Sequence, residues 1–143
     1  MGARRPPEAS VRRRVEWADT DASGHYHYAT ALRLFEAAES DLLDRLGLLG
    51  DVYGRLPRAH VSFDYRRVLW FRDTVEATVS VSELGRTSVT YGFEVVRGGE
   101  RCVGGRVVAV LVDESGSPVP WPERYRELLA SGDAGLDTPP GGA

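Results

Sequence analysis

The sequence contains no lysine. All 18 basic residues are arginines, in a chain of 143 residues with a formal net charge of −3. A slightly acidic chain is a poor candidate for general nucleic-acid binding, and we expect no nucleic-acid partner. Small groups of arginines can still hold a ligand that carries phosphate, because a guanidinium group binds phosphate with two parallel hydrogen bonds.

Cysteine and long hydrophobic runs are also scarce. The single cysteine, Cys102, excludes an internal disulfide and is typical of a reducing compartment. No stretch approaches the roughly 20 apolar residues that span a membrane. The basic N-terminus lacks the apolar segment of a secretory signal. We therefore predict a cytoplasmic protein that does not bind membranes.

The length and the 42% apolar content are typical of one globular domain. Residues 1–10 contain a proline pair and no periodicity, which predicts a disordered lead-in. Residues 131–143 are rich in glycine and proline and predict a flexible tail. The domain is then expected over residues 11–130.

The clearest helical pattern covers residues 28–46, and Gly47 is expected to end it. Apolar side chains with helical spacing form one stripe on it: Leu32, Phe35, Ala38, Leu42 and Leu46. Glu39 falls inside this stripe. A buried carboxylate is costly unless it is paired or used. Glu39 therefore either reaches solvent or an arginine at the end of the stripe, or belongs to a polar site.

Five segments read as strands and one as a short second helix. The strands are predicted over residues 11–18, 58–68, 73–84, 87–97 and 101–112, and the helix over 121–130. Tight turns are expected to link the last four strands, with Gly98–Gly99 as one of them. Gly104–Gly105 indicates a bulge or a close backbone approach.

One long helix beside a largely antiparallel sheet is an α+β arrangement. A single helix cannot cover both faces of five strands, so an apolar face or an open edge would remain exposed. We therefore expect the chain to form a homo-oligomer.

Residues 17–28, WADTDASGHYHY, concentrate carboxylates, imidazoles and phenols just before the long helix. A metal site could use His25 and His27 with aspartate oxygens, but a third ligand in a recognised spacing is missing, and we predict no metal. An ordinary capped loop is a second interpretation, since aspartate, threonine and serine are good turn and cap formers. Asp19 and Thr20 fit that structural role.

A catalytic site is the third interpretation of this segment. A helix N-terminus offers unpaired N–H groups, which can stabilise negative charge on a carbonyl oxygen during acyl transfer. Asp21, a few residues upstream, could attack that carbonyl or take a proton from water. Gly24 would let the backbone pass close to a ligand, and Tyr26, His27 or Tyr28 could supply a donor or shape the pocket.

Residues 17–39, WADTDASGHYHYATALRLFEAAE, resemble the hot-dog-fold acyl-CoA thioesterases of the 4-hydroxybenzoyl-CoA thioesterase group. Residues 57–67, PRAHVSFDYRR, and 85–88, GRTS, resemble later parts of the same family, and the likeness extends over about 11–128. It implies a single hot-dog domain, in which a five-stranded, largely antiparallel sheet wraps a long central helix and a short C-terminal helix follows. It also implies a dimer or tetramer with sites at the subunit boundary, and no cofactor.

The same resemblance implies that the chain hydrolyses an acyl thioester of coenzyme A or of acyl carrier protein. Asp21 matches the family's catalytic carboxylate, and the backbone N–H of Tyr28 would polarise the thioester carbonyl. His27 precedes Tyr28 where many relatives have the two residue types in the opposite order. The position of Glu39 can carry an active-site polar residue in related polyketide thioesterases.

The pocket and the nucleotide site draw on further residues. Phe63, with Trp17 and the tyrosines, could line an aromatic pocket or belong to the core. Arg66, Arg67 and Arg86 lie near strand ends, where they could bind phosphates of coenzyme A or remain solvated surface.

Two alternative functions stay open at this point. A hot-dog dehydratase or hydratase of 3-hydroxyacyl thioesters would use His25 or His27 with an acid. A non-catalytic member of the fold would bind acyl thioesters without turning them over.

Overall fold

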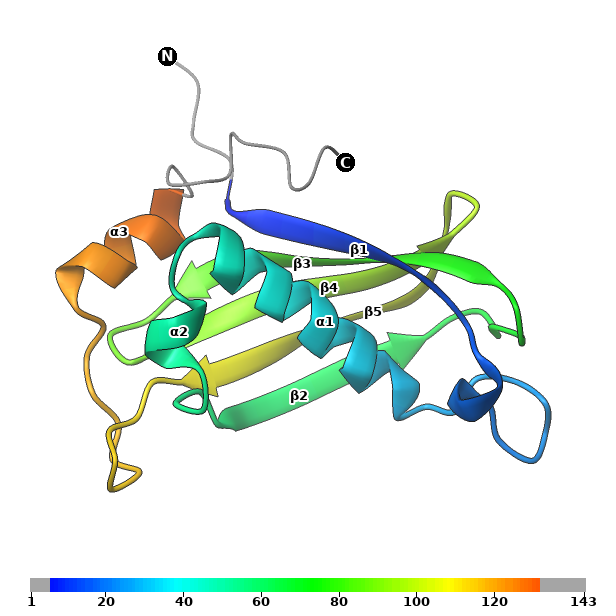
Figure 1. Ribbon diagram of the computed structural model, residues 1–143, viewed down its shortest axis with the longest axis horizontal. Coiled ribbons are helices and arrows are strands. Elements are labelled where there is room, and N and C mark those ends of the chain that lie inside the picture. Colours follow the sequence, from blue (N-terminus) through cyan, green and yellow to red (C-terminus); the bar gives the residue numbers. More distant parts are fainter. Residues whose placement is uncertain (1–5, 132–143) are drawn as a thin grey trace, which may run out of the picture.

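The computed structural model describes residues 6–131, in which one long helix crosses a five-stranded antiparallel sheet (Figure 1). The strands are β1 (Glu8–Arg14), β2 (Arg58–Tyr65), β3 (Thr74–Leu84), β4 (Ser88–Arg97) and β5 (Glu100–Val110). The helices are α1 (Thr30–Arg45), the one-turn α2 (Leu49–Val52) and α3 (Glu123–Ser131), with a short 3₁₀ turn, η1 (Trp17–Asp19), before α1. The predicted α+β fold is confirmed. Among the described helices, none is long and apolar enough to cross a membrane.

The strand order in the sheet is β1-β3-β4-β5-β2. β3, β4 and β5 follow one another through tight hairpins, and both glycines of the Gly98–Gly99 turn have positive φ, as predicted. The prediction of a tight turn between β2 and β3 is wrong. β2 pairs with β5 and β3 with β1, so residues 66–73 run from one edge of the sheet toward the other.

The first strand begins earlier than predicted, at Glu8, inside the expected lead-in. Its partner β3 decides this, because Glu8 pairs with Ser80 and the Ser10 and Thr78 hydroxyls lie 2.6 Å apart. The strand ends at Arg14, and Trp17 is 77% exposed in η1. Residues 1–5 and most of the predicted tail, 132–143, lie outside the described residues.

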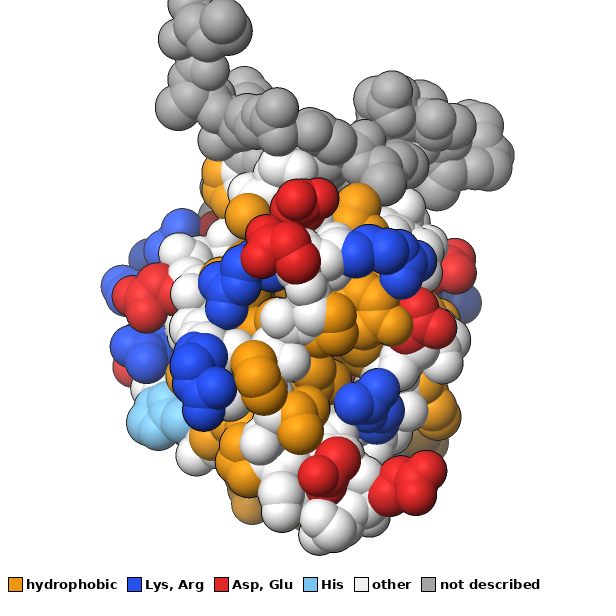
Figure 2. Space-filling view, turned by 90° about the vertical axis from the view of Figure 1, so that its left-hand side faces the viewer, with side chains coloured by type: hydrophobic (Ala, Val, Ile, Leu, Met, Phe, Trp, Pro, Cys, Tyr) orange, Lys and Arg blue, Asp and Glu red, His pale blue; other side chains and the backbone are white. Residues whose placement is uncertain are grey.

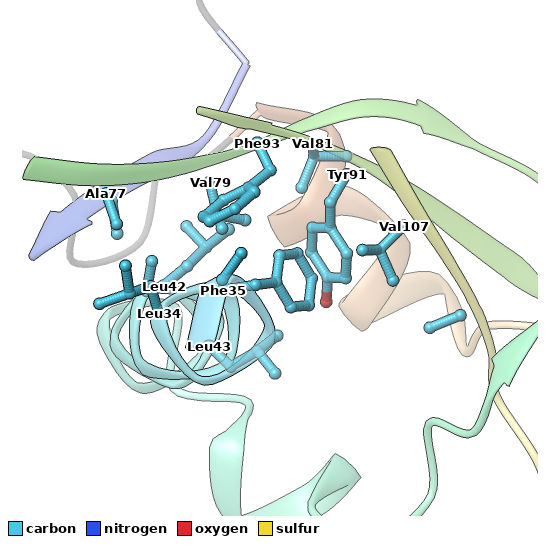
Figure 3. Close-up of a cluster of buried hydrophobic side chains, with 14 of the residues drawn as sticks. Leu34, Phe35, Leu42, Leu43, Ala77, Val79, Val81, Tyr91, Phe93 and Val107 are labelled. Atoms are coloured by element: carbon cyan, nitrogen blue, oxygen red, sulfur yellow. The ribbon is translucent and has the colours of Figure 1, made fainter. Parts of the chain in front are cut away.

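Helix α1 packs on the sheet through its apolar stripe. The Phe35 ring meets Tyr91 and Phe93 of β4 edge-on, with ring centroids 5.4 and 5.6 Å apart (Figure 3). The stripe is rotated slightly from the predicted one, because Ala31, Leu34 and Leu43 are also buried, whereas Leu32 is 40% exposed. This packing fixes where the N-terminus of α1 lies relative to the sheet.

Strand β2 forms an open edge of the sheet. β5 pairs with it on one side, and no described strand pairs with it on the other. Val61 and Tyr65 on β2 are 42% and 47% exposed. An edge of this length with exposed apolar side chains is a natural site for association with another strand.

The paired glycines of β5 differ in their surroundings. A Cβ atom at Gly105 would overlap the carbonyl oxygen of Ser62 and the backbone and ring of Phe63 on β2. A Cβ at Gly104 would come no closer than 3.4 Å, to the flexible Arg101 side chain. The sequence indicated either a bulge or a close backbone approach at Gly104–Gly105, and the structure has a close backbone approach at Gly105.

Gly105→Ala is expected to lower the free energy of unfolding by about 2 kcal/mol, because β2 must move away from β5 to admit the methyl group. Gly104→Ala serves as the matched control and should change it by less than about 0.5 kcal/mol. Chemical denaturation of both variants measures the difference. Equal losses in the two would contradict the close approach of Gly105 to β2.

Candidate active site

A pocket of about 360 Å³ opens between the loop that precedes α1 and the segment that connects β2 to β3. Its lining residues are Asp21, His25, Tyr26, Tyr28, Tyr65, Arg66, Arg67, Val68 and Leu69. Backbone hydrogen bonds join its two walls: the Tyr26 N–H donates to the Leu69 carbonyl over 2.9 Å, and His25 bridges to Trp70. Two segments distant in sequence are thereby fixed side by side.

Residues 21–25 form a tight loop in one of these walls. The Asp21 N–H donates to the His25 carbonyl at 3.0 Å, and the Gly24 N–H donates to the Asp21 carbonyl at 2.9 Å. Gly24 has φ +88°, a conformation that other residues rarely adopt. A Cβ atom there would meet nothing within 4 Å. Gly24 is therefore needed for its backbone conformation, and it does not line the pocket.

The Asp21 carboxylate is exposed at the pocket. Its Oδ1 accepts hydrogen bonds from the Ser23 hydroxyl and from the Ser23 N–H, the latter at 2.9 Å. These two bonds, the hydroxyl first, hold the pKa of the Asp21 carboxyl below its usual value, and the charges of His25 and His27 act in the same direction. The carboxylate is thus ionised at neutral pH.

The backbone N–H of Tyr28, another residue that lines this pocket, donates no hydrogen bond within the described residues 6–131. The carbonyl of the same peptide unit, from His27, accepts the Thr30 N–H at 2.9 Å, and in a planar peptide the N–H points the opposite way. The Tyr28 N–H is therefore directed away from the helix. The Tyr65 hydroxyl donates to the Tyr28 carbonyl at 2.7 Å and steadies this residue.

The helix begins at Thr30, two residues after the predicted start, and Ala29 is its N-cap. The His27 Nδ1 atom accepts the Ala29 N–H at 3.0 Å, and its ring stacks on Tyr28 at 4.7 Å. His27 is not among the pocket-lining residues. The structure therefore gives it a capping contact at the helix start.

Asp19 has the structural role predicted for it. Its Oδ2 accepts the Glu16 N–H at 2.7 Å, its Oδ1 pairs with Arg33 at 2.6 Å, and its carbonyl accepts the Thr30 hydroxyl at 3.0 Å. The Thr20 hydroxyl donates to the Trp17 carbonyl at 2.7 Å. These bonds anchor the loop that carries Asp21.

The predicted nucleotide-binding arginines lie in two places. Arg66 and Arg67 line the pocket, and Arg67 also pairs with Glu100 at 3.0 Å. Arg86 lies at the opposite end of the sheet, where its carbonyl accepts the Trp121 N–H. Phe63 packs on Phe93 with centroids 5.0 Å apart, and so joins the core rather than the pocket.

Glu39 lies in a second cavity, of about 640 Å³, bounded by α1, α2 and the start of β2. It is buried and accepts two hydrogen bonds from the Arg58 guanidinium, at 2.5 and 2.8 Å. Burial and the negative charge of Glu39 raise the pKa of Tyr91 well above its usual value. Figure 2 faces the end of the molecule with α2 and α3, where hydrophobic side chains lie exposed between charged ones. Within one chain, Glu39 does not share the cavity of Asp21.

Sequence reasoning missed three residues that shape these sites. Ser23 follows Asp21 by two positions, which is the spacing of an Asp–Ser turn and a usable signal. Tyr65 and Arg58 come from β2, and no local pattern predicts that they meet Tyr28 and Glu39. No three His, Cys, Asp or Glu side chains of residues 6–131 are grouped closely enough to hold a metal ion.

Comparison with known proteins shows which families and structures this chain resembles. Residues 15–129 match the thioesterase-like superfamily. A thioesterase from Thermus thermophilus, solved with coenzyme A and zinc, is 31% identical, with 87% of this chain and 92% of that one covered and a TM-score of 0.79. The 1,4-dihydroxy-2-naphthoyl-CoA thioesterase of Synechocystis is 19% identical, with 92% of this chain and 99% of that one covered and a TM-score of 0.78. This second structure shows a likeness in fold. A putative esterase from Aquifex aeolicus is 28% identical over 90 residues, which are 60% of this chain and 70% of that protein.

The buried Glu39–Arg58 pair predicts that replacing Glu39 destabilises the fold more than replacing Glu36, one turn earlier on α1. Glu39→Leu leaves the Arg58 guanidinium without its bidentate partner and should cost about 2 kcal/mol of unfolding free energy, less than a fully buried pair because Arg58 is partly exposed. Glu36→Leu is the control, since Glu36 is exposed and lies 3.9 Å from Arg58, and should cost under about 0.5 kcal/mol. Denaturant titration of both variants measures this. Indistinguishable unfolding free energies for the two variants would mean that the Glu39–Arg58 pair contributes nothing to stability.

Proposed function

The chain belongs to the thioesterase-like superfamily and hydrolyses acyl thioesters, and we propose that the pocket beside the N-terminus of α1 is where it does so. Two residues from one loop line this pocket: Asp21, whose carboxylate is ionised, and Tyr28, whose N–H has no partner within residues 6–131. Their presence in one pocket is the observation that carries the assignment of the site. The family match favours hydrolysis over hydration of an enoyl thioester and over binding without turnover.

The thioester carbonyl would lie with its oxygen on the Tyr28 N–H. This N–H precedes the first turn of α1, where the helix dipole adds positive potential. Both favour the negative charge that develops on the oxygen when the carbonyl carbon is attacked. The Tyr65 hydroxyl holds the Tyr28 carbonyl and so limits rotation of the residue. The oxyanion site is thereby formed before the substrate arrives.

Asp21 would act on the carbonyl carbon. As a carboxylate it can attack that carbon and form an anhydride that water then opens, or take the proton of an attacking water molecule. Either course expels the thiolate, which leaves with a proton as the free thiol. The low pKa of Asp21 keeps it ionised, as either course requires.

We propose coenzyme A as the thiol carrier. Arg66 and Arg67 line the pocket that holds Asp21, and their guanidinium groups can pair with the phosphates at the far end of the pantetheine arm. The related thioesterase of Thermus thermophilus, solved with coenzyme A, supports this choice. The cytoplasmic location predicted from the sequence agrees with a coenzyme A substrate and stays a prediction.

We also propose that the active unit is a homodimer joined along β2. Antiparallel pairing of β2 with its own copy would satisfy the open edge and cover Val61 and Tyr65. The homotetramer predicted as an alternative would add a second interface to this one.

Such a dimer would also unite the two cavities. Pairing about the middle of β2 brings Arg58 of one copy opposite Tyr65 of the other, and these residues line the Glu39 cavity and the Asp21 pocket, respectively. Each thioester would then face Asp21 of one subunit and the Glu39–Arg58 cavity of its partner. The apolar walls of that cavity, which include Leu43 and Leu49, would receive the acyl group. Glu39 would thus act on the substrate only in the dimer.

Replacement of Asp21 tests the site. Asp21→Ala should lower kcat/KM by about 10²–10⁴-fold on a panel of aryl, short-chain and long-chain acyl-CoA thioesters, since it removes the attacking or proton-accepting group. Asp113→Ala is the matched control, because Asp113 accepts the same pair of bonds from Ser115 in a turn remote from the pocket. Thiol release measures both. Undiminished hydrolysis by Asp21→Ala would remove Asp21 from the mechanism.

The wild-type protein can be examined for the identity of the attacking group. A single turnover of the wild type in ¹⁸O-labelled water, followed by mass spectrometry of the protein, should place label on Asp21 if its carboxylate attacks and water then opens the anhydride at the Asp21 carbonyl. Label on Asp21 would establish direct attack, because a carboxylate that acts only as a base keeps both of its oxygens.

The proposed interface predicts the oligomeric state. Val61→Glu would put two carboxylates next to each other at the β2 junction and should weaken dimerisation by at least about 10²-fold. Ala130→Glu on α3 adds the same charge away from β2 and should leave the dimer intact. Sedimentation analysis and thiol release are measured together, and Val61→Glu should lose both dimer and activity. A wild-type monomer with full activity would rule out the shared site.

A further inference from the structure

The Ser23 hydroxyl lies between two titratable groups. It donates to the Asp21 carboxylate, and its Oγ is 3.0 Å from the His25 Nε2 atom. Asp21, Ser23 and His25 are alternate residues of one tight loop, and Asp21 and His25 both line the pocket. A hydrogen-bonded chain therefore links an imidazole to the carboxylate that faces the substrate.

A second turn, at Asp113, shows that the Asp–Ser part of this arrangement also occurs away from the pocket. Asp113 accepts the Ser115 N–H at 2.9 Å and the Ser115 hydroxyl at 2.7 Å, as Asp21 does with Ser23. There the serine hydroxyl continues to Ser117, at 3.1 Å, which is not titratable in the neutral range. The Asp–Ser contact is thus a recurring turn, and the imidazole distinguishes the loop at Asp21.

The His25 ring is held in place. It meets the Trp70 ring edge-on, with centroids 5.5 Å apart and planes at 85°. Its backbone carbonyl accepts the Asp21 N–H, and its backbone bridges to Trp70 across the pocket wall. The Nε2 atom therefore stays within reach of the Ser23 hydroxyl.

We propose that His25 is a positioning residue, which acts through Ser23 to set how strongly the Asp21 carboxylate is hydrogen-bonded. The inference rests on the proposed function, in which Asp21 acts on the thioester. Neither Ser23 nor His25 needs to touch the reacting atoms.

The two protonation states of the imidazole give Ser23 different partners. When Nε2 carries a proton it donates to the Ser23 oxygen, and the serine proton points at Asp21. When Nε2 is bare, the serine hydroxyl can turn and donate to it, which leaves Asp21 with the Ser23 N–H alone. A carboxylate with one donor fewer is a stronger base and nucleophile. Hydrolysis should therefore rise as the imidazole loses its proton.

Other groups around His25 do not supply this change between pH 5 and 8. The charged and titratable residues that line the same pocket are Asp21, Tyr26, Tyr28, Tyr65, Arg66 and Arg67, and Arg72 and Asp73 follow Trp70, whose ring His25 meets. Phenols and guanidinium groups titrate above this range and carboxyl groups below it. His27 is the other imidazole whose charge acts on Asp21, so the test must separate it from His25.

The test is the pH profile of kcat/KM from pH 5 to 8.5. The wild type should show an increase of about tenfold across the imidazole range, the value of one hydrogen bond to a charged group. His25→Phe keeps an aromatic ring against Trp70, leaves the serine hydroxyl on Asp21, and should hold the rate at the low-pH plateau. Ser23→Ala should abolish the increase by removing the link.

Two control variants should keep the rise of kcat/KM with pH if the inference is correct. His27→Asn removes the neighbouring imidazole, and Ser115→Ala removes the hydroxyl from the matched turn at Asp113. NMR titration of the wild type, which has three histidines, should show that the His25 ring signal and kcat/KM change with the same midpoint. A midpoint shared with His27 instead would overturn the assignment.

The outcomes separate this inference from the function on which it rests. If Asp21→Ala retains full activity, the proposed function fails. If Asp21→Ala is inactive but His25→Phe or Ser23→Ala keeps the tenfold increase, only the role of His25 fails. Should His25→Phe fold poorly, Ser23→Ala decides alone, because an alanine two residues after Asp21 leaves the backbone bond from residue 23 in place.

Discussion

The packing of α1 against the sheet is the contact on which the rest of the structure depends. Phe35 sits against Tyr91 and Phe93, and the helix axis is thereby fixed across the strands (Figure 3). Two functional consequences follow from that one contact. The N-terminus of α1 comes to lie at the Asp21 pocket, and Glu39, further along the same helix, is carried into the second cavity. A hydrophobic contact therefore sets the distance between the polar groups.

The Asp21 pocket is made rigid by polar contacts rather than by burial. Asp19 ties its loop to α1, and Arg97 braces the opposite wall by donating to Asp73 at 2.8 Å and to the Val68 carbonyl at 2.9 Å. Burial tends to raise the pKa of Asp73, but the Trp70 N–H and Arg97 outweigh it and hold that pKa below its usual value. Charged side chains thus order a site that remains open to water, as a hydrolase requires.

Local patterns predicted those elements whose own residues carry the information. The strand predicted over 73–84 matches β3, and the predicted glycine pair matches the turn before β5, because strand periodicity and turn chemistry are properties of neighbouring residues. The start of β1 was mispredicted because it depends on pairing with β3. Leu32 was wrongly placed in the buried stripe because the rotation of α1 depends on the aromatic rings that the helix meets. His27 drew attention as a reactive side chain, whereas its partner is the backbone beside it.

The sequence by itself determined the family, the α+β class and the segment that holds Asp21, because a motif before an amphipathic helix is written in adjacent residues. Only the tertiary structure decided which distant residues meet there. Arg58 pairs with Glu39 and Tyr65 fixes Tyr28 because β2 lies at the sheet edge beside β5. Strand order is set by long-range hydrogen bonding and burial, and no local spacing encodes it.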